Sequence, residues 1–149
     1  MLLWLTVALS FLSSMIAKWL ADAFLHGRVA VIGSFLGLQY SLNPGIAFSI
    51  TFPGPLQTLL IVVALLAMIV VAVRSAHSPQ SQIAFGLIIG GAFGNIADRL
   101  LDGAVTDFVQ VGTFPVFNVA DSCITVGVAL LLLEMALRWR AGKEEKQGK

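Results

Sequence analysis

Four aspartates fall close together in the second half of the chain, at the ends of two apolar segments and between them. They are Asp98, Asp102, Asp107 and Asp121. Two carboxylates in contact cannot both ionise cheaply, so one keeps a proton near neutral pH while the other acts as a base. Such a pair can activate water against a peptide carbonyl and later protonate the leaving amine. This cluster therefore favours peptide hydrolysis, a reaction that needs here neither a metal nor a covalent intermediate.

Asp98 and Asp102 have simple structural explanations. Asp102 precedes Gly103 and is typical of a solvated loop, whereas Asp98 can pair with Arg99 or with water at a helix end. The residues alone do not exclude Asp98 from a catalytic pair.

Asp107 and Asp121 are the stronger candidates. Asp121 follows Asn118 by three residues, a spacing that also suits the first turn of a helix and its cap. Asp107 is surrounded by apolar residues that would partly dehydrate it, namely Val105, Phe108 and Val109. Both carboxylates are expected at the same membrane depth as Asn95 and Arg99, which share one helix face because they lie four residues apart.

Other catalytic schemes have fewer residues to support them. His26 and His77 are predicted on opposite sides of a membrane, and the single cysteine, Cys123, is interpreted as a small buried side chain, so no zinc site of the usual type is expected. Ser14 and Lys18 lie four residues apart and could form a serine–lysine dyad. Serine in a membrane helix more often bonds backbone, however, and a lysine at a helix end is typically an interface anchor.

A small transporter is the alternative from a different functional class. It requires an ionisable group near the middle of the bilayer. Glu134 is the one acid inside an apolar segment, and pairing with Arg138 four residues later is sufficient to explain it. The sequence therefore favours an enzyme over a transporter.

The elements that must position these groups are apolar segments. Hydrophobic residues make up 58% of the 149 residues and charged residues 11%, which is far from the balance of a soluble domain. Four segments, at 2–20, 56–73, 82–97 and 118–140, are each near the ~20 residues that a helix needs to cross hydrocarbon. We predict one membrane-embedded domain over 1–149, mainly α, with four transmembrane helices. The net charge of +1 argues against nucleic-acid binding.

The distribution of lysine and arginine predicts the orientation. The second loop, the end of the fourth segment and the tail at 141–149 contain Arg74, Arg138, Arg140, Lys143, Lys146 and Lys149, whereas the other loops contain Arg28 and Arg99. Cytoplasmic segments carry the excess of positive charge, so both termini are expected in the cytoplasm. The loops at 21–55 and 98–117 are then outer loops. β-Branched and aromatic residues over 29–40 predict short strands of a small extracytoplasmic β-sheet in the first of them.

Four motifs together resemble those of the lipoprotein signal peptidases, the signal peptidase II or A8 family of bacterial membrane aspartyl peptidases. They follow in order along nearly the whole chain: Asn43-Pro44-Gly45-Ile46-Ala47-Phe48-Ser49, Gly90-Gly91-Ala92-Phe93-Gly94-Asn95-Ile96-Ala97-Asp98-Arg99, Val105-Thr106-Asp107-Phe108 and Phe114-Pro115-Val116-Phe117-Asn118-Val119-Ala120-Asp121-Ser122. The first motif is also a turn signal, so for Asn43 a turn role stays open beside a binding role.

The resemblance implies that Asp107 and Asp121 are the catalytic pair, with no metal and no cofactor. It further implies that four side chains line the site and hold substrate carbonyls or orient the dyad: Asn43, Asn95, Arg99 and Asn118. Arginine suits this role because its planar donor fork stays charged even when it is partly buried.

The resemblance also implies the substrate and the location. The substrate would be a bacterial prolipoprotein whose lipobox cysteine carries a diacylglyceryl group, cut on the amino side of that cysteine. The enzyme would work as a monomer among the lipids of the bacterial inner (plasma) membrane, with its active site near the periplasmic face. The outer loops would close over the peptide and exclude water.

The chain departs from the family pattern on its first apolar segment. The family usually has an Asp-Gln pair before a lysine, and here Ser14 and Met15 stand at those places, while Lys18 matches. Ala97 stands where a larger aliphatic residue is usual. We expect these changes to affect substrate contacts or local stability rather than the activity itself.

Overall fold

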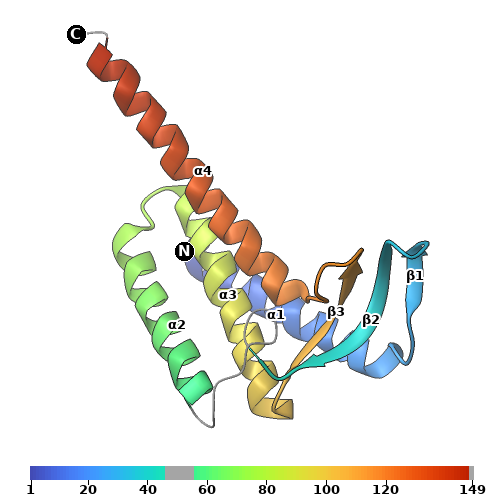
Figure 1. Ribbon diagram of the computed structural model, residues 1–149. Coiled ribbons are helices and arrows are strands. Elements are labelled where there is room, and N and C mark those ends of the chain that lie inside the picture. Colours follow the sequence, from blue (N-terminus) through green and yellow to red (C-terminus); the bar gives the residue numbers. More distant parts are fainter. Residues whose placement is uncertain (46–55, 148–149) are drawn as a thin grey trace.

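The computed structural model describes residues 1–45 and 56–147. Residues 46–49 of the first motif lie outside the described residues. The described elements follow in the order α1 (Leu2–Phe24), β1 (Val29–Ile32), β2 (Leu36–Asn43), α2 (Leu56–Ser75), α3 (Pro79–Asp102), β3 (Val105–Val111) and α4 (Val119–Gln147). The helices form one layered group, and the strands lie beside one end of it (Figure 1).

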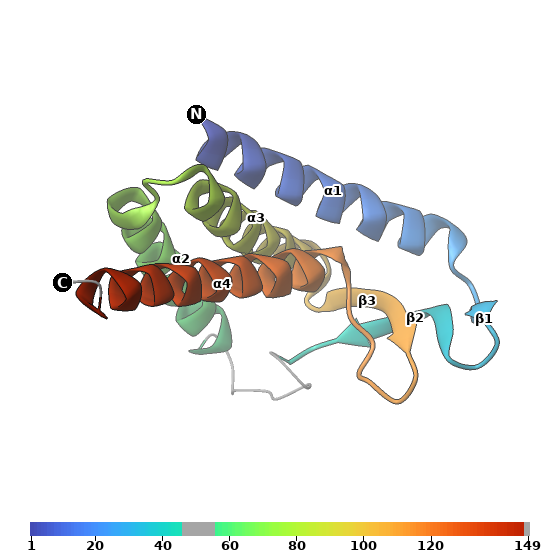
Figure 2. The same ribbon diagram turned by 90° about the horizontal axis from the view of Figure 1, so that it is seen from above.

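α3 is the central helix of the group, packed between α1 and α4, with α2 also beside it (Figures 1 and 2). Glycines allow this close packing. A Cβ placed on Gly90 would lie 2.5 Å from the carbonyl oxygen of Val7 in α1, and one on Gly91 would lie 2.5 Å from that of Ala120 in α4. The missing side chains of these glycines therefore let α1 and α4 approach the backbone of α3 closely.

The helices match the apolar segments of the sequence. Within residues 1–45 and 56–147, three are long and apolar enough to cross a membrane, at Leu2–Phe24, Pro79–Asp102 and Val119–Ala141, and α2 contains a shorter apolar helix, Leu59–Ser75. Large apolar side chains such as Leu59, Leu132 and Leu137 are exposed on these helices, as expected for surfaces that face lipid. That all four helices cross the membrane stays a prediction.

The helix ends differ from the predicted boundaries. α3 begins earlier than expected because Ser78 caps it, with Ser81 N donating to Ser78 Oγ at 3.0 Å and Ser78 N donating to Ser81 Oγ at 3.1 Å. It ends later, at Gly103, whose φ is 76°. Asp98 and Asp102 therefore lie on a helix, and assigning them to a loop at 98–117 was wrong.

The other helices are also longer than predicted. α1 continues to Phe24, and α4 continues to Gln147, so most of the predicted tail at 141–149 is helical (Figure 1). The predictions followed hydropathy, whereas polar residues such as Glu and Lys favour helix as strongly as many apolar ones.

The three strands form one antiparallel sheet in the order β1-β2-β3. β1 and β2 confirm the strands predicted over 29–40. β3 was not predicted, so the sheet is not confined to the loop at 21–55. It pairs with β2, placing Ser41 opposite Asp107 and Leu42 opposite Thr106. This pairing brings the end of β2 beside the aspartate of β3.

Candidate active site

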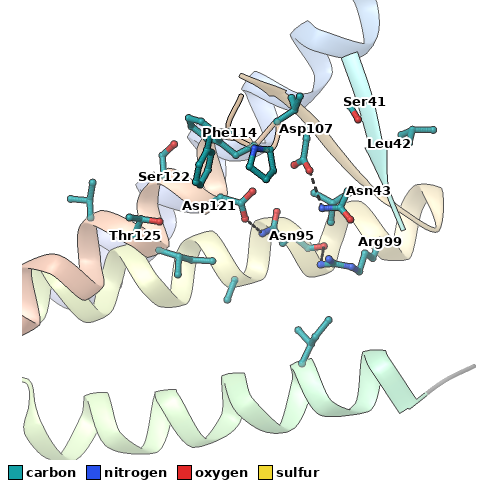
Figure 3. A pocket seen from close by; sticks show the side chains of 18 residues that line it. Ser41, Leu42, Asn43, Asn95, Arg99, Asp107, Phe114, Asp121, Ser122 and Thr125 are labelled. Atoms are coloured by element: carbon teal, nitrogen blue, oxygen red, sulfur yellow. Dashed lines mark hydrogen bonds between the residues drawn. The ribbon is translucent and has the colours of Figure 1, made fainter. Parts of the chain in front are cut away.

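A cavity of about 930 Å³ opens where β2, β3, α3 and the start of α4 meet, with α2 along one side (Figure 3). Five of the six predicted site residues line it: Asn43, Asn95, Arg99, Asp107 and Asp121. The sixth, Asn118, is buried behind them and bonds to both aspartates. The structure therefore brings the predicted set together from four separate elements.

Asp107 lies in the middle of β3 and is only 2% exposed. Asn43 Nδ2 donates to its Oδ2 at 3.0 Å, and Asn118 Nδ2 donates to its Oδ1 at 2.9 Å. Burial raises the pKa of Asp107 to about 6, and the negative charge of Asp121 acts in the same direction, against the two amide donors. A carboxyl with this pKa can take up or release a proton near neutral pH.

Asp121 lies in the first turn of α4 and serves two purposes. Its backbone N–H donates to Asn118 Oδ1 at 2.9 Å, and its Oδ2 accepts from the backbone N–H of Asn118 at 3.3 Å. These bonds confirm the helix cap that the three-residue spacing predicted. Its other oxygen accepts from Asn95 Nδ2 at 2.8 Å and faces the cavity (Figure 3).

Asn118 is the link between the two carboxylates. Its Nδ2 donates to Asp107 and also to Asn95 Oδ1, at 3.0 Å, while its Oδ1 caps the backbone of Asp121. Three asparagines thus hold four carboxylate oxygens through fixed donors: Asn43, Asn95 and Asn118. Such a network is organised before any substrate binds.

Arg99 fixes the turn that follows β2. Its Nη2 donates to the carbonyl oxygen of Gly45 at 2.6 Å, and its Nη1 to that of Asn95 at 3.3 Å. Asn43 supports the same turn, because its Oδ1 accepts from the N–H of Gly45 at 3.0 Å. The turn role considered for Asn43 is therefore confirmed, and its Nδ2 in addition bonds Asp107; its binding role stays a prediction.

Several pocket residues were missed by the sequence analysis. They are Ser41, Phe114, Ser122 and Thr125 (Figure 3). The helical spacing offered a signal for Thr125, which lies four residues after Asp121 and so on the same face of α4. Ser41 is opposite Asp107 in the sheet, a relationship that required knowing β3.

Asp98 is directed away from the cavity, towards α1. Its Oδ1 lies 3.4 Å from Lys18 Nζ, and its Oδ2 accepts from the backbone N–H of Thr106 at 2.6 Å. Lys18 is 5% exposed and also contacts Asp22 and Asp102. Asp98 was expected to pair with Arg99 or with water, and it pairs instead with Lys18, which acids from α1 and α3 surround. That Lys18 lies at the membrane interface stays a prediction.

The alternative Ser14–Lys18 dyad is not supported by the geometry. Ser14 Oγ donates to the carbonyl oxygen of Ser10 at 2.8 Å, the backbone bond expected of a helical serine.

Glu134 pairs with Arg138 at 2.6 Å, as predicted, and accepts from Ser78 Oγ at 2.7 Å. Cys123 is half-buried rather than fully buried.

Apolar helices surround a cavity that contains two aspartates, each hydrogen-bonded to asparagines. This combination is typical of a helical membrane enzyme. Comparison with known sequences gives the family. The profile of signal peptidase (SPase) II, peptidase family A8, matches residues 6–137, and the chain belongs to this family.

Curated relatives and solved structures agree with this family. A protein of Symbiobacterium thermophilum named lipoprotein signal peptidase is 38% identical over 135 residues, covering 85% of this chain and 89% of the relative. One of the same name from Chlorobaculum tepidum is 37% identical, covering 79% and 83%. A solved structure described as a bacterial membrane enzyme matches with a TM-score of 0.80 and 28% identity, covering 89% of this chain and 85% of that one.

Proposed function

We propose that the protein is an aspartic endopeptidase that removes signal peptides from diacylglyceryl-modified bacterial prolipoproteins. The cut falls on the amino side of the lipid-bearing cysteine. The relatives named lipoprotein signal peptidase support the substrate class. The observation that carries the catalytic assignment is that Asp107 and Asp121 line one cavity and both bond to Asn118.

Under this proposal, one carboxylate takes a proton from a water molecule as that water attacks the scissile carbonyl. The other carboxyl, protonated, polarises the carbonyl oxygen and then gives its proton to the leaving amine. The pKa of about 6 for Asp107 suits a group that exchanges a proton at neutral pH. The asparagine donors hold the two carboxyls in place, so little reorganisation accompanies the proton transfers.

The shape of the cavity fits an apolar peptide that arrives within a membrane. Beyond the aspartates, its walls are mainly apolar and come from three helices: Ile61, Ala92, Ile124 and Val126. The polar groups gather at the end next to the sheet, with Arg99 available there for backbone carbonyls. A signal-peptide helix placed along this apolar wall would present its end to the carboxylates.

The proposed setting is the bacterial inner membrane, crossed by all four helices. Both termini are cytoplasmic in this proposal, and the sheet and the aspartates lie near the periplasmic face. The lipid chains of the substrate then stay in the outer leaflet while its peptide enters the cavity. The protein is proposed to act as a monomer.

The test is cleavage of a diacylglyceryl-modified prolipoprotein by the purified protein in detergent, with the unmodified prolipoprotein in parallel. Asp107→Asn and Asp121→Asn are each expected to abolish cleavage, whereas Ser14→Ala and Glu134→Gln keep it. Glu134→Gln is the matched control, since it makes the same carboxylate-to-amide change on the part of α4 remote from the cavity. Full activity in either asparagine variant would remove that aspartate from the dyad.

A further inference from the structure

A charged cluster lies between α1 and α3, outside the cavity, and the proposed chemistry does not use it. It consists of Lys18, Asp22, Asp98 and Asp102. Lys18 Nζ is 2.6 Å from Asp102 Oδ2 and 3.4 Å from Asp98 Oδ1, and it hydrogen-bonds Asp22. The side chains of Lys18 and Asp98 are 6% and 4% exposed, against 47% for Asp102. Lys18 and Asp98 are thus the buried centre of the cluster.

Asp98 also reaches the strand that carries Asp107. β3 is an edge strand of the sheet, so alternate N–H groups along it point away from β2. Thr106 N–H is one of these, and it donates to Asp98 Oδ2 at 2.6 Å. Phe108 N–H is the next, and it donates to the carbonyl oxygen of Phe117 at 3.0 Å, an oxygen that also accepts from Val109 N–H at 2.7 Å. The outer edge of β3 is therefore held on both sides of Asp107.

These two contacts are unequal in kind. The bond from Phe108 joins neutral backbone groups, whereas the bond from Thr106 is made to a buried carboxyl group that lies 3.4 Å from Lys18 Nζ of α1. Charge-assisted bonds of this sort are roughly twice as strong as neutral ones. Asp98 thus ties the strand at Asp107 to α3 and, through Lys18, to α1, beside the apolar packing of Phe108 against Ala21 and Leu25 of α1.

We propose that Asp98 is a positioning residue for Asp107, held in place by Lys18. It fixes the edge of β3 so that both oxygens of Asp107 meet the amide groups of Asn43 and Asn118. Asp98 does not line the cavity, so its influence passes through the N–H of Thr106. This inference rests on the proposed function only in so far as it assigns a reaction to Asp107.

The alignment of Asp107 depends on two hydrogen bonds of 3.0 and 2.9 Å. A displacement of β3 by about 1 Å would break both, and misplacement on this scale costs about 100-fold in rate. Asp98→Ala removes the charge and the acceptor for Thr106 N–H. Asp98→Asn removes the charge and keeps an acceptor, so it is expected to recover much of the loss.

Asp102 offers a matched control. Its carboxylate contacts the same Lys18 Nζ, but none of the hydrogen bonds found for it among the described residues reaches β3. Asp102→Ala therefore perturbs the lysine without releasing the strand. If Asp98 acts only by compensating the charge of Lys18, the two alanine variants should behave alike.

The experiment measures two quantities on the full-length protein in detergent. The first is hydrogen–deuterium exchange of the backbone amides of β3, which needs no substrate. The second is kcat and KM for cleavage of the diacylglyceryl-modified prolipoprotein. For Asp98→Ala we expect faster exchange at Thr106 and neighbouring amides, and a kcat reduced about 100-fold with KM nearly unchanged. Asp98→Asn should regain at least part of kcat, and Asp102→Ala should match the wild type in both measurements.

Three results would overturn the inference. They are wild-type exchange of β3 in Asp98→Ala, an equal loss of kcat in Asp98→Ala and Asp102→Ala, and a change confined to KM. If Asp98→Ala does not fold, Asp98→Asn is compared with Asp102→Asn, and equal exchange of β3 in those two variants overturns it. A wild-type protein that does not cleave the prolipoprotein would refute the proposed function, while the exchange data would still decide whether Asp98 holds β3.

Discussion

Replacing Asn118 with serine would separate the two roles of this side chain. Serine is a good N-cap, so its hydroxyl can still accept from the N–H of Asp121 and preserve the start of α4. It cannot reach Asp107 Oδ1 and Asn95 Oδ1, which Asn118 Nδ2 contacts at 2.9 and 3.0 Å. The substitution therefore removes the link between the aspartates and leaves the helix cap.

The expected loss of activity follows from the hydrogen bond to Asp107 that the substitution removes. A hydrogen bond to a charged group contributes about 1.5–3 kcal/mol, and each 1.36 kcal/mol in the barrier is about tenfold in rate. Asn118→Ser should thus lower kcat/KM by roughly 10- to 100-fold. The Asn118 amide also lowers the pKa of Asp107 against the larger effect of burial. Without it, the pKa rises further above its ordinary value, and the limb of the pH–rate profile that reports Asp107 moves to higher pH.

The assay combines initial cleavage rates over a range of pH with thermal unfolding in detergent. Asn118→Ala provides the comparison, because it loses the cap as well and should cost a further ~0.5–2 kcal/mol of stability. Serine and alanine variants of equal stability would contradict the assigned cap. A lowered rate with an unmoved pH profile would refute the argument that Asn118 acts on Asp107.

Three further predictions concern other parts of the molecule. Burial raises the pKa of Asp107 from 3.8 to about 6, so the protonated carboxyl stabilises the folded state at acid pH. About 3 kcal/mol of the free energy of unfolding is lost as the pH rises from about 4 through 6. Thermal unfolding of the wild type relative to Asp107→Asn should show this fall, and a difference that does not change with pH would contradict it. Gly90→Ala should lower the melting temperature, since its Cβ would lie 2.5 Å from the carbonyl oxygen of Val7, whereas Gly27→Ala meets open space and should not. Arg99→Lys should reduce kcat/KM about tenfold, because one ammonium group cannot make both hydrogen bonds that the guanidinium donates to the carbonyl oxygens of Gly45 and Asn95. Wild-type kinetics in this variant would show that the two bonds are not needed.

The helices could be predicted from hydropathy, but their ends could not. The prediction for the third helix began at residue 82, where the apolar residues begin, although Ser78, Pro79 and Ser81 form a helix-start signal just before it. The apolar run indicates which residues contact lipid or core. Capping and helix propensity decide where the backbone stops being helical, and they act on polar residues as well.

β3 illustrates a different limit of sequence reasoning. Its residues, Val105–Val111, form a strand because β2 pairs with them across more than sixty positions of sequence. The local cues were present, since Gly103 and Gly112 bound the segment and both have positive φ. Nothing local, however, identifies the partner strand, and the position of Asp107 follows from that partner.

In the candidate site too, the local contacts could be predicted from the sequence and the long-range contacts could not. The Asn118–Asp121 cap and the shared face of Asn95 and Arg99 follow from spacings of three and four residues, and both were predicted. The burial of Lys18 among three carboxylates joins α1 to α3, which no local pattern indicates. Ser14 stands where the family usually has an aspartate, and the acids that pair with Lys18 in this protein are Asp22, Asp98 and Asp102.

The asparagine network has a consequence for how the protein matures in the membrane. Asn43, Asn95, Asp107 and Asp121 come from β2, α3, β3 and the first turn of α4. While α4 is still being synthesised or inserted, Asp121 and its partner Asn118 are not in place, and Asp107 lacks one of its two donors. Under the proposed mechanism, a nascent chain consequently has no complete active site, and proteolytic competence arises only when α4 docks against α3.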